Sequence, residues 1–459
     1  MEVTKVKSKI IIGNSHILKP GYHMNYGKKR IEKAIYNKFP FESLGNVSAS
    51  VFTGGIFKRV FVDDPKYGHP YISAQHMMNS NPLDVAKLIS KKYTPRQEEM
   101  SLKENQILVS CAGTIGNVRL ITKDLTGVIG SQDIIRVDPN NTKLPYGYLY
   151  AYLASKTAYN YMQSYIYGSV VPRIEPKTLS RLPIPILTAE KQHQIHLLIV
   201  EASELAVKAN KILTLITKEI ESNFVLTKRN KTEIISIKTI LEGDKYTSES
   251  RLESDFYSNS VKEIEFQIKK DNYCMLGDLV QEIYRSGLRE RKFVKENGIP
   301  MITGQDLSQR NLSGLKQLSK KFTRNIDKST AKNKDILISV QGTIGRVEYV
   351  LNNQYKGVFA SEQLSKITIN ENLIHPGYVF AFLKSKVGQI LINKYKTGSI
   401  IEWIKENNIA SVLIPIPSDL GKRIGVEIDK YAELFNLSVT KENQAIALIE
   451  KEIDLWQVS

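Results

Sequence analysis

Cysteine is nearly absent from this chain. Its 459 residues include only Cys111 and Cys274, and neither stands at a metal-ligand spacing from any of the seven histidines. Two cysteines cannot build a disulfide framework, so a disulfide-held secreted fold and a cysteine-histidine zinc site are both excluded. We interpret both residues as plain buried thiols and expect a reducing, cytoplasmic location and no bound metal.

Long hydrophobic runs are absent too. No apolar stretch approaches the roughly 18 residues that a membrane-spanning helix needs. The start of the chain contains the short run Ile10-Ile11-Ile12 but no ordered signal-peptide regions. We therefore expect no membrane partner. With 42% apolar and 24% charged residues, the composition is that of a globular protein long enough for two or more domains.

Acidic residues are in deficit. Lys and Arg number 64 against 47 Asp and Glu, which gives a formal net charge of +17. An isoelectric point near 9.4 favours a polyanionic partner. Nucleic acid is the expected partner, and an acidic membrane surface is only the weaker alternative.

Motifs that carry chemistry are also missing. Asn81-Pro82 lacks the second proline and the aromatic residue of a pocket that holds a flipped base. The glycine-containing stretch Gly21–Lys29 has the wrong spacing for a phosphate-binding loop, and no Ser or Thr follows Lys28. The acidic pair Asp63-Asp64 has no nearby Glu-x-Lys partner of a nuclease. We predict that the chain is not an enzyme and binds no cofactor itself.

What the chain does contain is a repeat with a period of about 230 residues. ILVSCAGTIGNVRLI at 107–121 aligns without a gap with ILISVQGTIGRVEYV at 336–350, with eight identities in fifteen positions. Shorter matches keep the same order: Leu44–Val47 with Leu276–Leu279, Tyr71–Gln75 with Met301–Gln305, Lys91–Thr94 with Lys320–Thr323, Gly168–Val170 with Gly398–Ile400, and Pro183–Pro185 with Pro415–Pro417. The sequence therefore predicts two copies of one domain.

Each copy combines predicted strands with a predicted helix. The β-branched stretches 107–109 and 118–121 flank Gly113-Thr114-Ile115-Gly116 and predict a β-hairpin. We interpret that glycine pair, and its repeat at 342–345, as a structural turn, with a backbone phosphate contact as the alternative. Apolar residues at helical spacing predict one helix at 146–165 and one at 377–395, each packed on the sheet.

Two long helices end the two copies. From Ala189 to about Lys228, apolar and small residues follow a 4-3-4-3 spacing with no Pro or Gly between them, which is typical of a helix that packs along a partner helix. The last 40 residues keep the same spacing, weakened by Ser438, Glu442 and Glu452. The predicted seam residues are Ile195, Ile199, Ala202, Ala206, Ala209, Leu213, Ile216, Ile220, Ile424, Ile428, Tyr431, Phe435, Ala445, Ile449 and Trp456.

The expected fold class is α+β. Two duplicated mixed α/β domains, at 1–187 and 229–417, are separated by long helices at 188–228 and 418–459 that form an antiparallel coiled coil. The alternative is that the two helices lie on the surfaces of separate domains.

Basic residues gather in runs at related places in the two copies. Arg285–Glu296 holds five basic residues against two acids, and Lys316–Lys334 holds seven against one. Such runs are either solvated faces or DNA contacts, in which Arg can pair with guanine and Gln with adenine. The candidate DNA-binding residues are Lys58, Arg59, Gln75, Lys91, Lys92, Ser169, Arg173, Arg285, Arg289, Arg291, Lys292, Gln305, Lys320, Lys321 and Ser399.

Taken together, these motifs identify a resemblance. The two-copy plan, the ILxSxxGTIG stretch, the Gly-Ser-hydrophobic loop, the Pro-Ile-Pro exit and Glu190-Lys191-Gln192 at the head of the first long helix resemble the specificity subunit of type I restriction-modification systems. The closely similar recognition subunits of type IIB systems share them. Arg251-Leu252-Glu253 with Phe256-Tyr257 resembles the start of a recognition domain in these relatives. The second exit departs from the pattern, because no Glu-Gln pair follows it.

The resemblance implies a division of labour. Two target-recognition domains would each read one half of a bipartite double-stranded DNA site, held apart by the helix pair. Methyltransferase subunits, two in number, would bring S-adenosylmethionine, and a restriction or translocase subunit is a further partner that the resemblance allows. A free-standing DNA-binding regulator and a DNA-modifying enzyme with unrecognised catalytic residues remain alternative classes.

The basic run that begins at Arg285 generates a first prediction. Replacing Arg285, Arg289 and Arg291 together by Ala should weaken DNA binding and flatten its salt dependence. With fewer phosphate contacts, the protein displaces fewer counterions from the DNA when it binds. The measurement is the slope of log affinity against log salt concentration. An unchanged slope would show that these arginines do not lie on the DNA.

Overall fold

The computed structural model describes residues 19–168, 172–227, 234–242, 251–288, 290–312, 314–417 and 419–458. The chain divides into two compact units: unit 1 is Met1–Val207 with Leu437–Ser459, and unit 2 is Lys208–Asn436. Both boundaries fall inside long helices, so each long helix contributes residues to both units. The domain limits drawn from the sequence stay a prediction.

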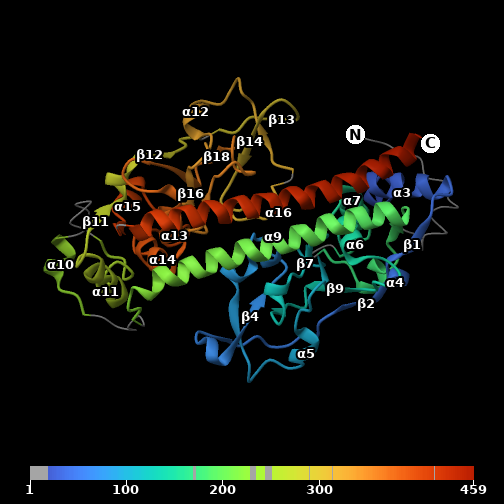
Figure 1. The fold of residues 1–459 in the computed structure, drawn as a ribbon, viewed down its shortest axis with the longest axis horizontal. Coiled ribbons are helices and arrows are strands. Elements are labelled where there is room, and N and C mark those ends of the chain that lie inside the picture. The colour runs from blue at the N-terminus through green and yellow to red at the C-terminus, as the bar shows by residue number, and fades with distance from the viewer. Residues whose placement is uncertain are drawn as a thin grey trace. The chain divides into compact units, whose positions relative to one another are not determined.

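Unit 1 is built on two four-stranded sheets (Figure 1). The large sheet is antiparallel and has the order β2 (Ser48–Thr53), β9 (Ile134–Pro139), β6 (Ile107–Ser110), β7 (Val118–Leu120). The small sheet has the order β3 (Phe61–Val62), β5 (Lys87–Ser90), β4 (Gly68–Ile72), β8 (Ile129–Gly130), and its last pair is parallel. A separate two-stranded pair joins β1 (Phe41–Ser43) to β10 (Pro183–Pro185).

Short helices surround these sheets. They are α2 (Pro20–His23), α3 (Tyr26–Tyr36), α4 (Leu44–Val47), α5 (Gln97–Met100), α6 (Tyr146–Leu153), α7 (Lys156–Ser164) and α8 (Pro176–Leu179), with 3-10 turns at Pro65–Tyr67, His76–Met78, Pro82–Val85 and Lys123–Leu125. Helix α6 is apolar all round because it is buried all round, in one core with Ile107 and Val137 of the large sheet and Ile195 of the long helix. The hydroxyl of Tyr148 donates to the carbonyl of Pro185 at 2.6 Å, so this fully buried tyrosine is satisfied.

Unit 2 repeats the same plan. Its large sheet is β12 (Val280–Arg285), β19 (Leu364–Ile369), β16 (Ile336–Ser339), β17 (Val347–Tyr349), and its small sheet is β13 (Phe293–Val294), β15 (Gln317–Leu318), β14 (Ile299–Ile302), β18 (Phe359–Ala360). The pair β11 (Tyr273–Met275) and β20 (Leu413–Pro415) matches β1 and β10. The helices are α10 (Ile237–Glu242), α11 (Asn259–Ile268), α12 (Ile326–Ser329), α13 (Pro376–Lys384), α14 (Lys386–Asn393) and α15 (Glu406–Ala410), with a 3-10 turn at Leu276–Leu279. The duplicated α+β fold is thus confirmed.

The predicted hairpin is confirmed in both copies, but the predicted single helix after it is wrong. Strands β6 and β7 pair antiparallel, as do β16 and β17. The stretch 146–165 forms two helices, because Ser155 takes an extended conformation and its Oγ accepts the N–H of Ala158. Ser385 caps α14 in the same way, through the N–H of Gly388. Although the apolar residues keep helical spacing throughout, the N-cap serine ends the first helix and starts a second one.

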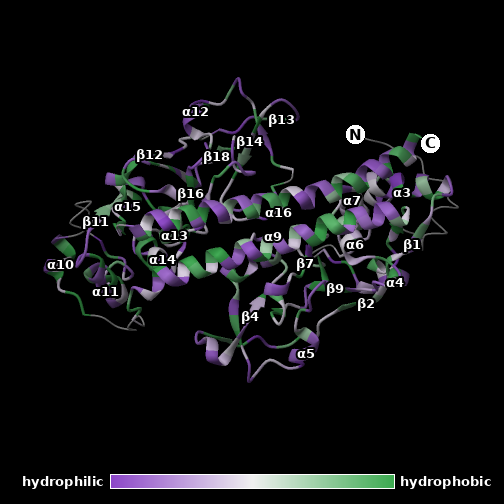
Figure 2. Ribbon diagram, viewed as in Figure 1, coloured by the Kyte–Doolittle hydropathy of each residue, from purple (hydrophilic) through white to green (hydrophobic). Residues whose placement is uncertain are grey.

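The long helices are α9 (Ala189–Ser222) and α16 (Asp419–Val458). In unit 1 they run antiparallel, since Lys191 pairs with Glu452 at 2.6 Å and Glu201 with Lys441 at 2.9 Å. In unit 2, Arg423 pairs with Glu219. Figure 2 shows polar and apolar residues alternating along both helices. Every seam residue named from the sequence is buried.

The polar residues of the α16 seam have defined partners. Ser438 donates its hydroxyl to the carbonyl of Ala202 at 2.7 Å, and Tyr150 donates its hydroxyl to the buried carboxylate of Glu442 at 2.6 Å. A buried polar group that is paired in one geometry favours one register over others. These residues therefore specify how α16 lies in unit 1.

None of the helices in the described part of the chain combines the length and hydropathy of a bilayer-spanning segment.

The end of α16 is bound to the first helices of the chain. Arg30 of α3 is buried and donates to Glu450 at 2.6 Å, while Glu450 also accepts the backbone N–H of Thr157 at 2.7 Å. Trp456 stacks on Phe39 with ring centres 4.6 Å apart. Unit 1 therefore folds around residues from both ends of the sequence.

We predict that Arg30→Met lowers the free energy of unfolding of unit 1 by about 1–3 kcal/mol, because it leaves a carboxylate of the core short of a charged donor. The chain has two tryptophans. In a Trp403→Phe background, Trp456 fluorescence reports unit 1 alone during urea unfolding. Arg96→Met is the matched control, since Arg96 is 56% exposed in its pair with Glu99, and it should change stability by less than about 0.5 kcal/mol. Equal effects of the two variants would contradict the prediction.

Candidate nucleic-acid interface

The two motifs that repeat most clearly in the sequence lie next to each other in each unit. The glycine turns have positive φ at Gly113 and Gly116 (72° and 86°) and at Gly342 and Gly345 (78° and 84°), a conformation that glycine adopts at little cost. Beside each turn, the base of the Gly-Ser loop is closed by a bridge, Tyr167–Arg173 in unit 1 and Thr397–Trp403 in unit 2. The same Arg173 and Trp403 bridge to Ala112 and Gln341, so the base of the loop is joined to the stretch that leads into the turn.

Exposed glutamines lie on a second loop of each unit. Gln75 and Gln305 are exposed, and each loop is anchored by an arginine from the hairpin. Arg119 donates to the carbonyl of Met77 at 3.0 Å and to that of Ser80 at 3.2 Å. Arg346 donates to the carbonyls of Gly304 and Leu307 at 3.4 and 3.3 Å. In both copies, an arginine of the hairpin therefore holds the glutamine loop by donating to its backbone carbonyls. The two arginines stand at different positions of the hairpin.

The small sheets carry exposed aromatic rings with lysines over them. In unit 1 the ammonium of Lys87 lies 5.5 Å from the centre of the Phe61 ring, and that of Lys92 lies 5.4 Å from the Tyr93 ring. Both rings are exposed.

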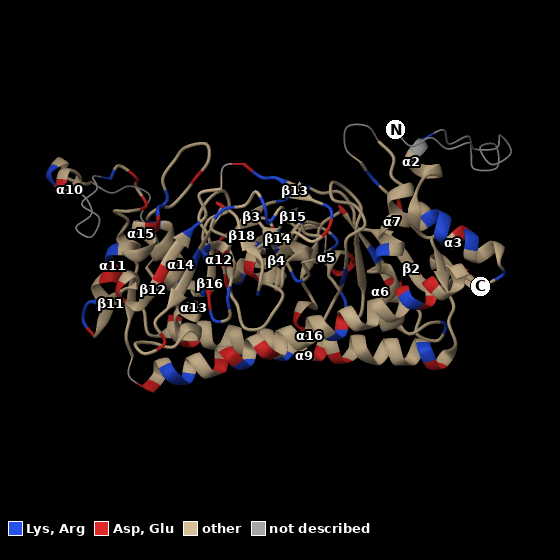
Figure 3. Ribbon diagram, turned by 90° about the horizontal axis from the view of Figure 1, so that it is seen from above, with Lys and Arg blue, Asp and Glu red and all other residues tan. Residues whose placement is uncertain are grey.

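Unit 2 repeats this arrangement. Lys316 lies 5.3 Å from the centre of the Phe293 ring, and Lys292 and Lys321 lie 4.4 and 5.6 Å from the Phe322 ring. Both rings are exposed. Figure 3 shows β13 and β15 on the side of unit 2 away from α16, with Lys and Arg beside them. We call Phe61, Lys87, Lys92, Tyr93 and their counterparts Phe293, Lys316, Lys321, Phe322 the aromatic-lysine sets.

The family model of the type I restriction modification DNA specificity domain matches residues 38–200 and again 269–447. The chain belongs to this family. Each matched segment contains one copy of the repeat and reaches into a long helix.

Solved structures with similarity to the chain include two specificity subunits. The S subunit of the type I restriction-modification system of M. genitalium is 14% identical, with 90% of this chain and 96% of that chain covered and a TM-score of 0.37. The HsdS subunit from Thermoanaerobacter tengcongensis is 13% identical, with 90% and 96% covered and a TM-score of 0.29. No functionally curated sequence matches.

The basic residues expected to bind DNA in this specificity-family chain differ in their surroundings. Arg285 and Arg291 are bound to Glu362, the first through the backbone carbonyl at 2.6 Å and the second as an ion pair. Arg173 pairs with Asp133 at 3.7 Å, and Arg59 donates to the hydroxyl of Tyr71 at 3.4 Å.

The remaining candidates form a second group, which is exposed to solvent. Its members are Lys58, Lys91, Lys92, Lys292, Lys320, Lys321 and Ser399. Ser169 and Arg289 lie outside the described residues. All of these residues stay predicted DNA contacts.

Of the eight residues of the aromatic-lysine sets, sequence reasoning named only Lys92 and Lys321 as candidates. Phe61-Val62 and Phe293-Val294 are the same dipeptide at equivalent places. Lys87, the first residue of β5, corresponds to Lys316, which directly precedes β15. A search for exposed aromatics shared by the copies would have found them. Their exposure could not have been read from the sequence, because a Phe in a strand is ordinarily part of the core.

Among the described residues, no three His, Cys, Asp or Glu side chains lie close enough together to hold a metal ion. Burial raises the pKa of the Cys111 thiol to about 11. This thiol is therefore protonated at neutral pH and is a poor nucleophile.

We predict that Arg119→Met loosens the Gln75 loop without unfolding unit 1. Each lost hydrogen bond from the guanidinium should speed hydrogen exchange at residues 76–80 by about tenfold or more, measured by mass spectrometry. Lys123→Met, at an exposed position, is the control and should leave these amides unchanged. Identical exchange in the two variants would show that Arg119 does not hold the loop.

Proposed function

We propose that this chain is the sequence-specific DNA-recognition subunit of a restriction-modification complex, with each unit reading one part of a bipartite site. The observation that carries the proposal is the occurrence of the same aromatic-lysine set on the small sheet of both units, within a family of DNA-specificity domains. Two equivalent surfaces on one chain suit two segments of one DNA molecule.

The chemistry of these surfaces suits DNA. Lysine ammonium groups neutralise phosphates and release condensed counterions, which supplies affinity without sequence information. Exposed aromatic rings beside them can add apolar contact with sugars and with the thymine methyl groups of the duplex. The net charge of +17 supports the same partner. Base reading falls to polar side chains on the loops, among which Gln75 and Gln305 are suited to adenine.

The proposal includes partners. Methyltransferase subunits would dock on this chain and bring S-adenosylmethionine, and this chain would contribute recognition without catalysis. Each unit combines an internal core with a share of two long helices, which leaves the recognition loops free for DNA. A lone chain that transferred methyl groups would instead point to an enzyme, and a lone chain that regulated transcription would point to a repressor-like protein.

The test is base-resolution methylation mapping in cells that contain the chain together with its neighbouring methyltransferase. We expect one methylated motif made of two short segments with an unread spacer, present only when this chain is present. A motif that persists after deletion of the chain would overturn the proposal. So would S-adenosylmethionine bound stoichiometrically by the isolated chain.

A further prediction concerns the lysines of unit 2. Replacing Lys316, Lys320 and Lys321 by Ala should reduce the magnitude of the salt slope of DNA binding by about 2 to 3, close to 0.9 for each lost phosphate contact. The methylated motif should stay the same while methylation at all sites falls.

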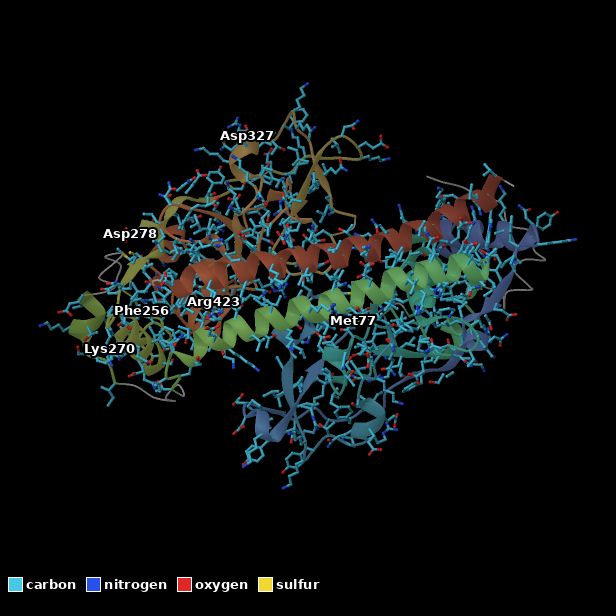
Figure 4. The ribbon with its side chains drawn as sticks, in the orientation of Figure 1. Met77, Phe256, Lys270, Asp278, Asp327 and Arg423 are labelled. Carbon is cyan, nitrogen blue, oxygen red and sulfur yellow. The ribbon has the colours of Figure 1, made fainter. Side chains whose placement is uncertain are left out.

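The chain offers a matched control for these lysines. Lys270 lies 4.4 Å from the centre of the Phe266 ring and is also an exposed lysine over an exposed aromatic ring, but on α11. Figure 4 shows Lys270 well apart from Asp327 of α12, which marks the small-sheet side of unit 2. Lys270→Ala should leave affinity and salt slope unchanged. A loss in Lys270→Ala as large as the loss per lysine in the triple variant would show that the effect is one of net charge alone.

A further inference from the structure

A three-residue loop crosses from the small sheet to the large sheet in each unit. It is Ser131-Gln132-Asp133 in unit 1 and Ser361-Glu362-Gln363 in unit 2, and we call it the crossing loop. Its backbone is held alike in both: the serine hydroxyl accepts the N–H two residues on, at 3.2 and 3.3 Å.

The same equivalence holds at the third residue of the loop. The carbonyl of Asp133 accepts the N–H of Cys111 at 3.1 Å, and that of Gln363 accepts the N–H of Val340 at 2.9 Å. The scaffold is therefore the same, while two of the three side chains differ.

In unit 2 the crossing loop organises a cluster of polar side chains. Arg285 donates from Nε to the carbonyl of Glu362 at 2.6 Å and from Nη2 to Oε1 of Gln341 at 3.2 Å. Arg291 forms an ion pair with Oε1 of Glu362. Gln363 accepts the N–H of Gly304 at 3.0 Å, which ties the cluster to the glutamine loop. An arginine held by two acceptors presents its remaining N–H groups in a fixed direction.

Unit 1 has different residues at the same places. The end of β2 carries Thr53 where β12 carries Arg285, and the bridge partner is Ala112 where unit 2 has Gln341. Asp133 pairs with Arg173, which stands where unit 2 has Trp403. The two copies thus agree in backbone and differ in donors and acceptors, which is what two readers of different bases on one scaffold require.

The crossing loop also carries an unsatisfied acceptor in each unit. Oε1 of Gln132 and Oε2 of Glu362 are buried and have no hydrogen-bond partner among the described residues. The Glu362 side chain as a whole is 28% exposed, so the cluster reaches the surface although Oε2 itself is covered. An acceptor without a donor is unfavourable, and it recurs at the same position in two copies with different side chains. The exocyclic amino group of cytosine or adenine is a donor that fits.

We infer that the crossing loop and the side chains bound to it form a base-reading position in each unit, beside the glutamine loop. In unit 2 the readers are Arg285 and Glu362, and Gln341 is a positioning residue that orients Arg285. In unit 1 the readers are Gln132 and Arg173, and Asp133 orients Arg173. The inference rests on the proposed function and assigns its specificity to these residues, whereas the aromatic-lysine sets supply affinity.

The experiment uses the full chain in its complex with the methyltransferase. Arg285→Lys keeps the charge but loses the two-pronged geometry that suits guanine, and Glu362→Gln replaces a pure acceptor by a mixed donor and acceptor. In methylation maps, each variant should lose about 10- to 100-fold of its discrimination at one base position of one half-site. The other half-site should stay unchanged. Gln132→Ala should do the converse.

Lys321→Ala is the comparison, since it should lower methylation at all motifs alike and leave both half-sites unaltered. Because the other bases of the altered half-site are read by the mutated unit itself, their continued recognition shows that this unit is folded. Unchanged motifs with Arg285→Lys, Glu362→Gln and Gln132→Ala would overturn the inference, as would a uniform fall in methylation with no relaxed base. A wild-type chain that confers no motif would overturn the proposed function itself.

Discussion

A helix of 34 residues with an apolar seam along its length cannot bury that seam inside one small domain, and the rest of this fold depends on how the seam is covered. In unit 1 the cover is the end of α16, which brings Ala445, Ile449 and Ile453 into the core that also contains α6 and the large sheet. The core of the first domain therefore requires residues from the end of α16, far along the chain. Tyr150, Glu442, Ser438 and Ala202 then select one register for the pair.

The two copies show how one backbone accommodates different side chains. The first helix after the hairpin begins at the same place in both units, and the N–H of its first glycine is accepted by a histidine. In unit 1 this is His196 of α9, which accepts from Gly147 at 3.2 Å. In unit 2 it is His375, which accepts from Gly377 at 3.1 Å, while Gly425 of α16 makes room for it. Burial lowers the pKa of His196, which keeps the ring neutral and able to accept.

The same tolerance explains how recognition can vary without loss of the fold. Arg136 is fully buried in β9 and donates to the carbonyls of Gly130 and Met100 at 2.8 and 3.2 Å. Its counterpart Lys366 lies 3.8 Å from Glu282 and 3.9 Å from Asp335. The buried cation of each large sheet is thus stabilised by different means, backbone carbonyls for Arg136 and carboxylates for Lys366. What must be kept is the hydrogen-bonded frame, and the side chains exposed around it can change with the DNA to be read.

The sequence alone determined the features that depend on local pattern. The period of about 230 residues predicted two domains, alternation around a glycine pair predicted the hairpins, and heptad spacing predicted the long helices, because each signal lies within one short stretch. It also indicated the family. It failed at 146–165, where one serine hydroxyl redirected the chain.

Only the tertiary structure decided which polar side chains meet. Arg285 lies 77 residues from Glu362 in sequence and 56 from Gln341, and Arg30 lies 420 from Glu450, so no local pattern marks these pairs. The crossing loop could not be recognised from the sequence either, because only the tertiary structure shows that it joins two sheets. The exposure of Phe61 and Phe293 was likewise set by the fold: whether an aromatic side chain is covered depends on residues distant in sequence, and these come together only when the whole chain has packed.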